Sequence, residues 1–202
     1  MDQIFLCLTR LCACLTLGLP LFASSTVFDR PEKQEALRHN HIRRLPPSSF
    51  SELPKLTVKQ LEALGCTIPQ VDGELKSHNV IHGSFTRPGQ SDWAVLCSRS
   101  GESSILVIWG RPTACPGELA TANDARYQQG DASGHLVFSR QISRVNRDHI
   151  LKYRQAFSSD GNGTLKDSPR LDHEGIEDTF VGKASEIHYC SQGKWQTLQG
   201  ED

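Results

Sequence analysis

The stretch DWAVLCSRSGESSILVIWG, residues 92–110, decides the fold of this chain. Apolar residues dominate 92–98 and 103–110, and Gly101 lies between them, so the pattern predicts two strands joined by a tight turn. Successive side chains of a strand point to opposite faces, and here apolar residues occupy both the odd and the even positions. Both faces of the hairpin are therefore predicted to be covered, which places it at the centre of a sheet.

Shorter patterns predict the other elements of a domain. Apolar residues at helical spacing indicate two helices, at 58–64 and 146–157. Further strands are predicted at 79–85, 136–142, 187–190 and 194–198. Together these elements predict an α+β fold, with an antiparallel β-sheet core and a few short flanking helices.

The sequence also predicts the ends of the first helix and the segments between strands. Thr57 is the expected N-cap, Gln60 completes the capping-box spacing, and Gly65 is expected to end the helix. Residues 111–134 are rich in glycine, proline and polar types, which indicates a long loop. Residues 172–183 are expected to carry one or two helical turns.

Residues 1–25 have the features of a secretory signal peptide. Arg10 precedes an apolar stretch, 11–23, which suits a signal and is too short to span a membrane. Cleavage is predicted after Ala23 or after Ser25, and an uncleaved membrane tether is the alternative. With cleavage the mature chain has no predicted spanning segment and is expected outside the cytoplasm, in a periplasm or secreted.

The remainder of the chain is predicted to form one domain behind a polar lead-in. Residues 26–56 are polar, basic and proline-containing, and 45–49 (LPPSS) is typical of a linker. Residues 57–202 are predicted to form a single globular domain.

Cysteine usage agrees with export. Three of the seven cysteines fall in the predicted signal, and four remain: Cys66, Cys97, Cys115 and Cys190. An even number in an exported chain predicts two disulfides, for which three pairings exist. We favour Cys66–Cys97 with Cys115–Cys190, and free buried cysteines are the alternative. No C-x-x-C motif is present, which argues against thioredoxin-like redox chemistry and against a zinc ribbon.

The charge balance argues against a nucleic-acid partner. The chain has 22 Lys and Arg against 23 Asp and Glu, a formal net charge of −1, whereas nucleic-acid binding calls for a basic excess. A locally basic stretch indicates the solvated face of the second helix, with contact to an anionic envelope surface as the alternative: Arg140, Arg144, Arg147, Lys152 and Arg154. No phosphate-binding glycine loop occurs, and no cofactor is predicted.

Two clusters carry candidate chemistry. Asp172, His173 and Glu177 could bind a cation or orient the histidine as a general base, and acids that complement a helix dipole are the alternative. The segment 158–169 resembles an EF-hand calcium loop, with ligand types at its third, fifth and seventh positions and with Ser158 and Pro169 at its two ends. The candidate calcium ligands are Asp160, Asn162 and Thr164.

Residues 83–95 resemble a single repeat of the FG-GAP type found in integrin propellers. Gly83, Phe85, Gly89, Asp92 and the apolar run after Asp92 match that pattern. The positions of the acidic calcium ligands are occupied by Ser84, Thr86 and Pro88, so the resemblance implies a loop shape and not a calcium site.

A broader resemblance is to uncharacterised exported bacterial proteins. It rests on the stretches 65–70, 79–98, 104–109 and 172–185. It implies a single extracytoplasmic domain and brings no known activity.

A clear apolar sheet without a nucleophile motif favours a non-catalytic exported domain that binds another macromolecule or an envelope component. The alternative is a small extracytoplasmic hydrolase or metal-dependent enzyme that uses the Asp172, His173 and Glu177 cluster.

Overall fold

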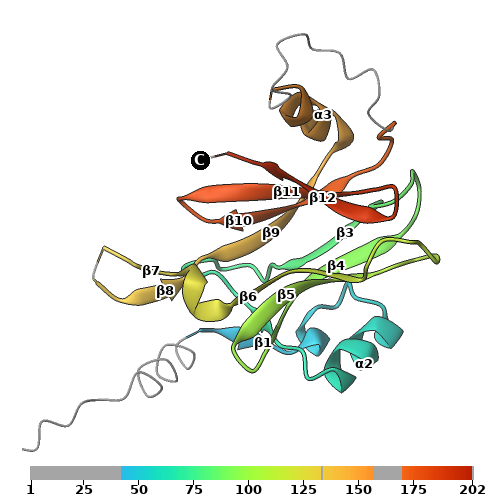
Figure 1. The fold of residues 1–202 in the computed structure, drawn as a ribbon. Coiled ribbons are helices and arrows are strands. Elements are labelled where there is room, and N and C mark those ends of the chain that lie inside the picture. The colour runs from blue at the N-terminus through green and yellow to red at the C-terminus, as the bar shows by residue number, and fades with distance from the viewer. Residues whose placement is uncertain (1–41, 133, 157–169, 202) are drawn as a thin grey trace, which may run out of the picture.

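A computed structural model of the chain describes residues 42–132, 134–156 and 170–201. Within them lie two four-stranded antiparallel sheets, two short two-stranded ladders and two α-helices (Figure 1). The prediction of a sheet-rich antiparallel fold with a few helices is therefore confirmed.

The first sheet is built on the predicted hairpin. Its strands are hydrogen-bonded in the order β3 (Val80–Gly83), β4 (Asp92–Arg99), β5 (Glu102–Ile108) and β6 (Glu118–Asn123). Ser100 and Gly101, with φ of 52° and 84°, have the left-handed backbone that a two-residue hairpin turn requires. Both faces of the hairpin are buried, because its alternate side chains belong to different core clusters.

The second sheet packs against the first. Its order is β12 (Lys194–Gln199), β11 (Ala184–Ser191), β10 (Gly175–Phe180) and β9 (Arg140–Val145). The main core cluster joins the two sheets, since it includes Leu96 and Ile105 from the first sheet together with Ile142 and Ile176 from the second. Figure 1 shows the second sheet lying across the first.

The outer faces of both sheets are covered by helices. α2 (Lys55–Ala63) and the segment before it bury Phe50, Leu53 and Leu61 against the first sheet. α3 (Arg147–Ala156) buries Ile150 against Ile187 of the second. The order of layers is therefore helix, sheet, sheet, helix.

The linker interpretation of residues 45–49 is wrong. Leu45 belongs to β1 (Arg44–Leu45), which pairs with β2 (Ile68–Pro69), and a 3-10 helix follows at Pro47–Ser49. Phe50 and Leu53 then enter the core at 2 % and 5 % exposure. The segment is packed despite its prolines, because isolated apolar residues reach the first sheet.

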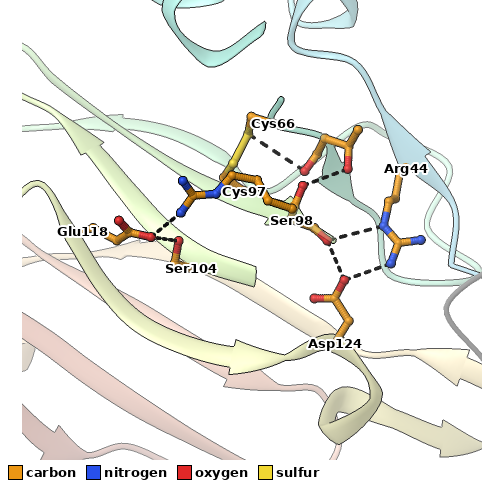
Figure 2. Close-up of a disulfide and its surroundings, with 9 residues drawn as sticks. Arg44, Cys66, Cys97, Ser98, Ser104, Glu118 and Asp124 are labelled. Atoms are coloured by element: carbon orange, nitrogen blue, oxygen red, sulfur yellow. Dashed lines mark hydrogen bonds and ion pairs between the residues drawn. A yellow bond between two sulfur atoms is a disulfide. The ribbon is translucent and has the colours of Figure 1, made fainter. Parts of the chain in front are cut away.

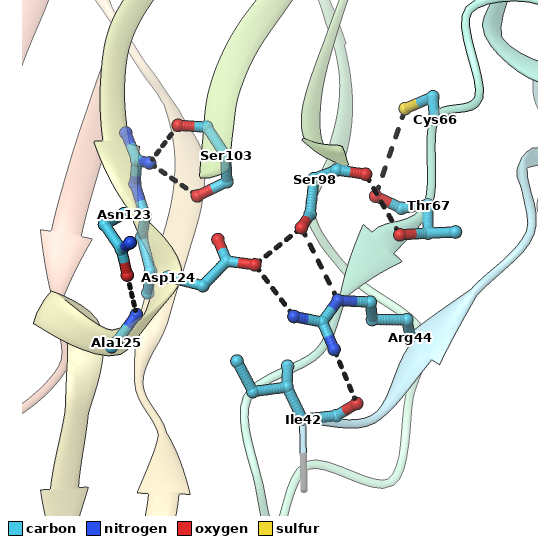
Figure 3. A network of polar contacts seen from close by, with 10 residues as sticks. Ile42, Arg44, Cys66, Thr67, Ser98, Ser103, Asn123, Asp124 and Ala125 are labelled. Atoms are coloured by element: carbon cyan, nitrogen blue, oxygen red, sulfur yellow. Dashed lines mark hydrogen bonds and ion pairs between the residues drawn. The ribbon is translucent and has the colours of Figure 1, made fainter. Parts of the chain in front are cut away.

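Arg44 anchors the same segment by charge. Its Nη2 lies 2.8 Å from Oδ2 of the buried Asp124, and its Nη1 donates to the Ile42 carbonyl at 3.3 Å (Figure 3). The Ser98 hydroxyl, on β4, donates to the same Asp124 oxygen. The ion pair thus joins β1 to the 3-10 helix Asp124–Tyr127 beyond β6.

Three element predictions are corrected. α2 begins at Lys55 after an N-cap at Pro54, so Thr57 is a buried position inside the helix; Gly65, with φ of 70°, follows its end as predicted. The predicted loop 111–134 contains β6, the 3-10 helix and β7 (Gln128–Gly130), which pairs with β8 (Leu136–Phe138). The predicted strand 136–142 is divided at Ser139 into β8 and β9.

The predicted helical turns at 172–183 are instead β10, paired with β9 and β11 along its length. Ile176 and Asp178 are buried and Glu177 is half-buried, which is the alternation of a strand. The apolar alternation that would predict a strand is interrupted, because the carboxylate of Asp178 occupies a core position of β10.

Both favoured disulfide pairings are confirmed. Cys66–Cys97 ties the turn after α2 to β4, with a Cα–Cα distance of 5.3 Å (Figure 2). Cys115–Cys190 ties the β5–β6 connection to β11 across 75 residues of sequence and thereby links the two sheets. Such bonds are compatible with an oxidising compartment. Among the described residues, no helix has the length and hydropathy to cross a bilayer.

Candidate functional site

A polar cleft of about 520 Å³ opens where three segments meet: the turn after β3, the junction of β9 with α3, and the segment that leads into β10. Its lining comprises His82, Gly83, Ser84, Pro88, Arg144, Asn146, Arg147, Asp148, Asp172, His173 and Glu174. The predicted candidates Asp172 and His173 therefore lie together in a concave site.

Glu174 fastens two walls of this cleft together. Its Oε2 accepts a hydrogen bond from the Ser84 amide at 2.8 Å, and its own amide donates to the Ser84 carbonyl at 2.9 Å. Arg144 Nε stands 3.5 Å from the other carboxylate oxygen. A Cβ on Gly83 would meet the Phe85 ring at 2.7 Å and Glu174 at 3.0 Å, so this close approach requires glycine.

Asp92 shapes the loop between β3 and β4, the stretch that resembles an FG-GAP repeat. Its side chain is fully buried. Oδ2 accepts from the Phe85 amide at 3.0 Å, while Oδ1 accepts from Gln90 Nε2 at 2.8 Å and from the Gly110 amide at 2.9 Å. These three hydrogen bonds hold the two ends of the loop and the residue that follows β5 in one arrangement.

His173 is the one buried histidine of the cleft among the residues described. It is 7 % exposed, and its Nδ1 lies 2.8 Å from the Glu174 carbonyl. A carbonyl oxygen can only accept, so Nδ1 carries a hydrogen, and in the neutral tautomer with this bond the lone pair is on the other ring nitrogen, Nε2. No side chain of the described residues is hydrogen-bonded to Nε2, which leaves this atom available to a ligand.

A second cavity, of about 330 Å³, lies beside the first and shares Asp172 and His173 with it. It is bordered by Thr86 and Arg87 on one side and by the β11–β12 turn on the other. Arg147 Nε donates to the Leu171 carbonyl at 2.8 Å and so fixes the segment that separates the two cavities. We call the pair of cavities the His173 cleft.

The two halves of the His173 cleft differ in charge. The larger cavity has two arginines and three acids: Arg144, Arg147, Asp148, Asp172 and Glu174. The smaller has two arginines and one acid: Arg87, Arg170 and Asp172. Asp172 belongs to both counts, so the residues that line only one cavity are balanced in charge in the larger cavity and are two arginines in the smaller one.

Glu177, the third member of the predicted cluster, lies apart from this cleft. It belongs to β10, and its two carboxylate oxygens accept from Ser143 Oγ at 3.1 Å and from Ser185 Oγ at 2.9 Å. The alternation of the strand turns Glu177 away from the face of Ile176, so a set of Asp172, His173 and Glu177 is not assembled. The candidate calcium ligands Asp160, Asn162 and Thr164 lie outside the described residues. Among those described, no three His, Cys, Asp or Glu side chains form a group that could hold a metal ion.

Known proteins provide no guide to this site. Comparison with protein families, curated proteins and solved structures finds no match. The function must therefore be argued from the geometry of the chain itself.

Three other histidines, His78, His82 and His188, have different surroundings. His78 Nε2 accepts from the Val71 amide at 2.7 Å and Nδ1 contacts the Lys76 carbonyl, so this side chain closes a turn. His82 lines the larger cavity, and its Nε2 lies 2.7 Å from Ser91 Oγ. His188 is buried in the second sheet, where desolvation lowers its pKa.

Sequence reasoning missed most of the cleft. The sequence predicts Arg144 and Arg147 on a solvated basic face, or in contact with an anionic envelope surface, and Ser84 only as part of a loop shape. It does not predict that Glu174 meets Ser84. Arg140, from the same basic stretch, is not on the helix at all: it is fully buried in β9. The signal that was present is the capping side chain Asn146, whose Oδ1 accepts from the His149 amide at 2.9 Å and marks the start of α3 beside the cleft.

Proposed function

We propose that this chain is an exported, non-catalytic binding domain, periplasmic or secreted, that holds a short peptide segment of a partner in the His173 cleft. The observation that carries the proposal is the unequal charge of the two cavities on either side of His173: the acids Asp148 and Glu174 line only the larger one, two arginines without a further acid line only the smaller one, and Asp172 is shared. A ligand that fills both is favoured when it has a cationic and an anionic group, and a peptide supplies these along one extended backbone.

The free Nε2 of His173 suits the same ligand. With Nδ1 bonded to the Glu174 carbonyl, Nε2 is placed to accept a hydrogen bond from a backbone amide that crosses between the cavities. Because the side chain is nearly buried, that acceptor loses little entropy on binding.

Binding is favoured over catalysis by how the neighbouring charges are used. Nδ1 of His173 is hydrogen-bonded to a carbonyl and not to a carboxylate. The Glu174 carboxylate is bound to the Ser84 amide and lies beside Arg144. A hydrolase that forms a covalent intermediate would need a side-chain nucleophile within hydrogen-bond reach of the free imidazole nitrogen. Among the side chains in the described part of the chain, none makes that bond.

Export is supported by the leader sequence and by the two disulfides. The intact mass of protein recovered from outside the cytoplasm tests it directly. The expected mass corresponds to cleavage after Ala23 or Ser25, with two fewer hydrogens for each disulfide. Protein found only in the cytoplasm, with Cys66, Cys97, Cys115 and Cys190 all as free thiols, would contradict the proposal.

Peptide binding is tested by calorimetric titration of the oxidised protein with short peptides whose ends are acetylated and amidated. The probes contain Lys and Asp separated by glycines, the reversed order, and a neutral version with Gln and Asn. One Lys–Asp order is expected to bind at least about tenfold more tightly than the neutral peptide, which corresponds to about 1.4 kcal/mol.

The matched variant is His173→Asn, because its amide nitrogen can keep the bond to the Glu174 carbonyl while Nε2 is lost. It is expected to weaken the preferred peptide about tenfold without a change in melting temperature. Lys59→Ala, on the exposed side of α2, is the control and should bind as the wild type does. Equal affinity for charged and neutral peptides, or no effect of His173→Asn, would overturn the proposal.

A further inference from the structure

A separate pair of cavities lies between the two sheets, where the 3-10 helix Asp124–Tyr127 and β6 face β10 and β11. Their volumes are about 390 and 180 Å³, and four residues line both: Tyr127, Asp178, Phe180 and Glu186. The shared wall therefore consists of two aromatic rings and two carboxylates. None of the described residues that line it also lines the His173 cleft.

The strand register brings the two carboxylates together. Asp178 and Glu186 are direct partners across β10 and β11. Like charges that stand opposite each other on neighbouring strands destabilise a sheet unless a cation compensates them. Arg140 compensates Asp178, with Nε 2.9 Å from Oδ1 and Nη2 2.7 Å from Oδ2.

Glu186 has no such partner among the described residues. Its nearest ionisable contact is His188, whose Nε2 lies 3.7 Å from Oε2 and is buried without a hydrogen bond. Burial lowers the pKa of this imidazole, so at neutral pH it adds no positive charge. The Glu186 side chain is 58 % exposed and lines both cavities with its charge uncompensated.

The aromatic rings of this wall already attract cations from within the chain. The Arg140 guanidinium carbon lies 4.5 Å from the centroid of the Tyr127 ring, and Lys183 Nζ lies 4.2 Å from that of Phe180. The two rings meet edge to face, with centroids 5.5 Å apart. A cation over a ring face and beside a carboxylate is stabilised by both, and more strongly where water is excluded. Arg140 and Lys183 thus already make, within the chain, the cation–π contacts that a bound cation would make with these rings.

We propose that the cavities around Tyr127, Phe180 and Glu186 bind an organic cation with an ammonium or guanidinium head on an alkyl stem. The head lies beside the Glu186 carboxylate and against the aromatic rings, and the stem lies along the small apolar side chains of the cavity wall, Ala120, Ala122 and Ala184. The same chemistry is offered by a free alkylamine and by a lysine or arginine side chain of a peptide.

The test is a titration of the oxidised protein with butylammonium, butylguanidinium and butanol, followed by the amide resonances of residues 178–186. Both cations are expected to shift these resonances in a saturable way, whereas butanol, which has the same stem without the charge, is not. Comparison of 1,3-diaminopropane with acetylated and amidated Ala-Lys-Ala and Ala-Arg-Ala then tells whether a free amine or a peptide side chain is the better source of the cation.

Glu186→Gln removes the uncompensated charge at an exposed position, so the fold is retained, and it is expected to weaken the cations about tenfold. Glu62→Gln on α2 makes the same charge change far from the site and is expected to have no effect. Lys183→Met removes the competing intramolecular cation and should leave binding equal or tighter. The proposal is overturned if the cations shift these resonances no more than butanol does, or if Glu186→Gln binds them as the wild type does.

Discussion

Replacement of Arg140 by methionine tests how the two sheets are held together. The guanidinium is fully buried, and each of its five N–H groups donates a hydrogen bond. Two go to Asp178, two to the hydroxyl and carbonyl of Ser103 on β5, and one to the Ala120 carbonyl on β6 at 2.6 Å. A single side chain of the second sheet therefore satisfies polar groups on two strands of the first.

The cost of Arg140→Met follows from what it leaves behind. Asp178, 6 % exposed, becomes a buried charge without a partner, which typically costs about 3–5 kcal/mol. For a chain of this size, each kcal/mol lowers the melting temperature by roughly 2–4 °C. A urea titration of the oxidised protein, followed by tryptophan fluorescence, measures the free energy of unfolding.

Two further variants separate the charge from the packing. Arg140→Lys keeps the charge but cannot make the paired bonds to Asp178, so an intermediate loss is expected. Adding Asp178→Leu to Arg140→Met removes the orphaned carboxylate and should recover part of the stability. The reasoning is refuted if Arg140→Met costs less than about 1 kcal/mol, or if the double variant is no more stable than the single one.

Two other predictions concern the buried imidazole and the N-terminal segment. Because burial lowers the pKa of His188 in the folded state, the unfolded chain binds a proton that the folded chain resists, so stability is full above about pH 6.5 and falls as the pH drops below it. Urea titrations at pH 7.5 and 5.5 should show a larger loss for the wild type than for His188→Gln, and equal losses would contradict the assignment. A shortened chain that begins at residue 57 loses the buried Phe50 and Leu53, together on the order of 5–10 kcal/mol, and is expected to be unfolded by circular dichroism, whereas one that begins at residue 42 stays folded. A folded chain from residue 57 would show that the segment is dispensable.

The central hairpin was predictable because its information is local. The apolar residues of 92–98 and 103–110 alternate on both faces, and Gly101 stands where the turn needs a left-handed backbone. The disulfide pairing was also accessible, since few pairings exist for four cysteines. Neither inference required knowledge of a distant segment.

The elements that were missed depend on partners far away in sequence. β10 has an acid, Asp178, at a core position, which is tolerated only because Arg140, 38 residues earlier, meets it there. The segment before α2 has scattered apolar residues without a helical or strand period, and its burial follows from the surface of β4 and β5 that it covers. In the cleft, the bond between Ser84 and Glu174 spans 90 residues. A single sequence carries no signal for such pairs.

The two proposed binding sites lie at opposite ends of β10. Glu174, before the strand, borders the His173 cleft, and Phe180, its last residue, lines the cation site. Six strand residues span roughly 20 Å, which exceeds the screening length of about 8–10 Å at physiological salt. Charges at one end therefore act weakly on the other, and the effects of Glu186→Gln and His173→Asn should be confined to their own ligands. The Arg140–Asp178 pair borders the cation site and also joins the two sheets. A variant of this pair that abolishes binding at both ends has therefore disrupted the packing of the sheets and says nothing about either ligand.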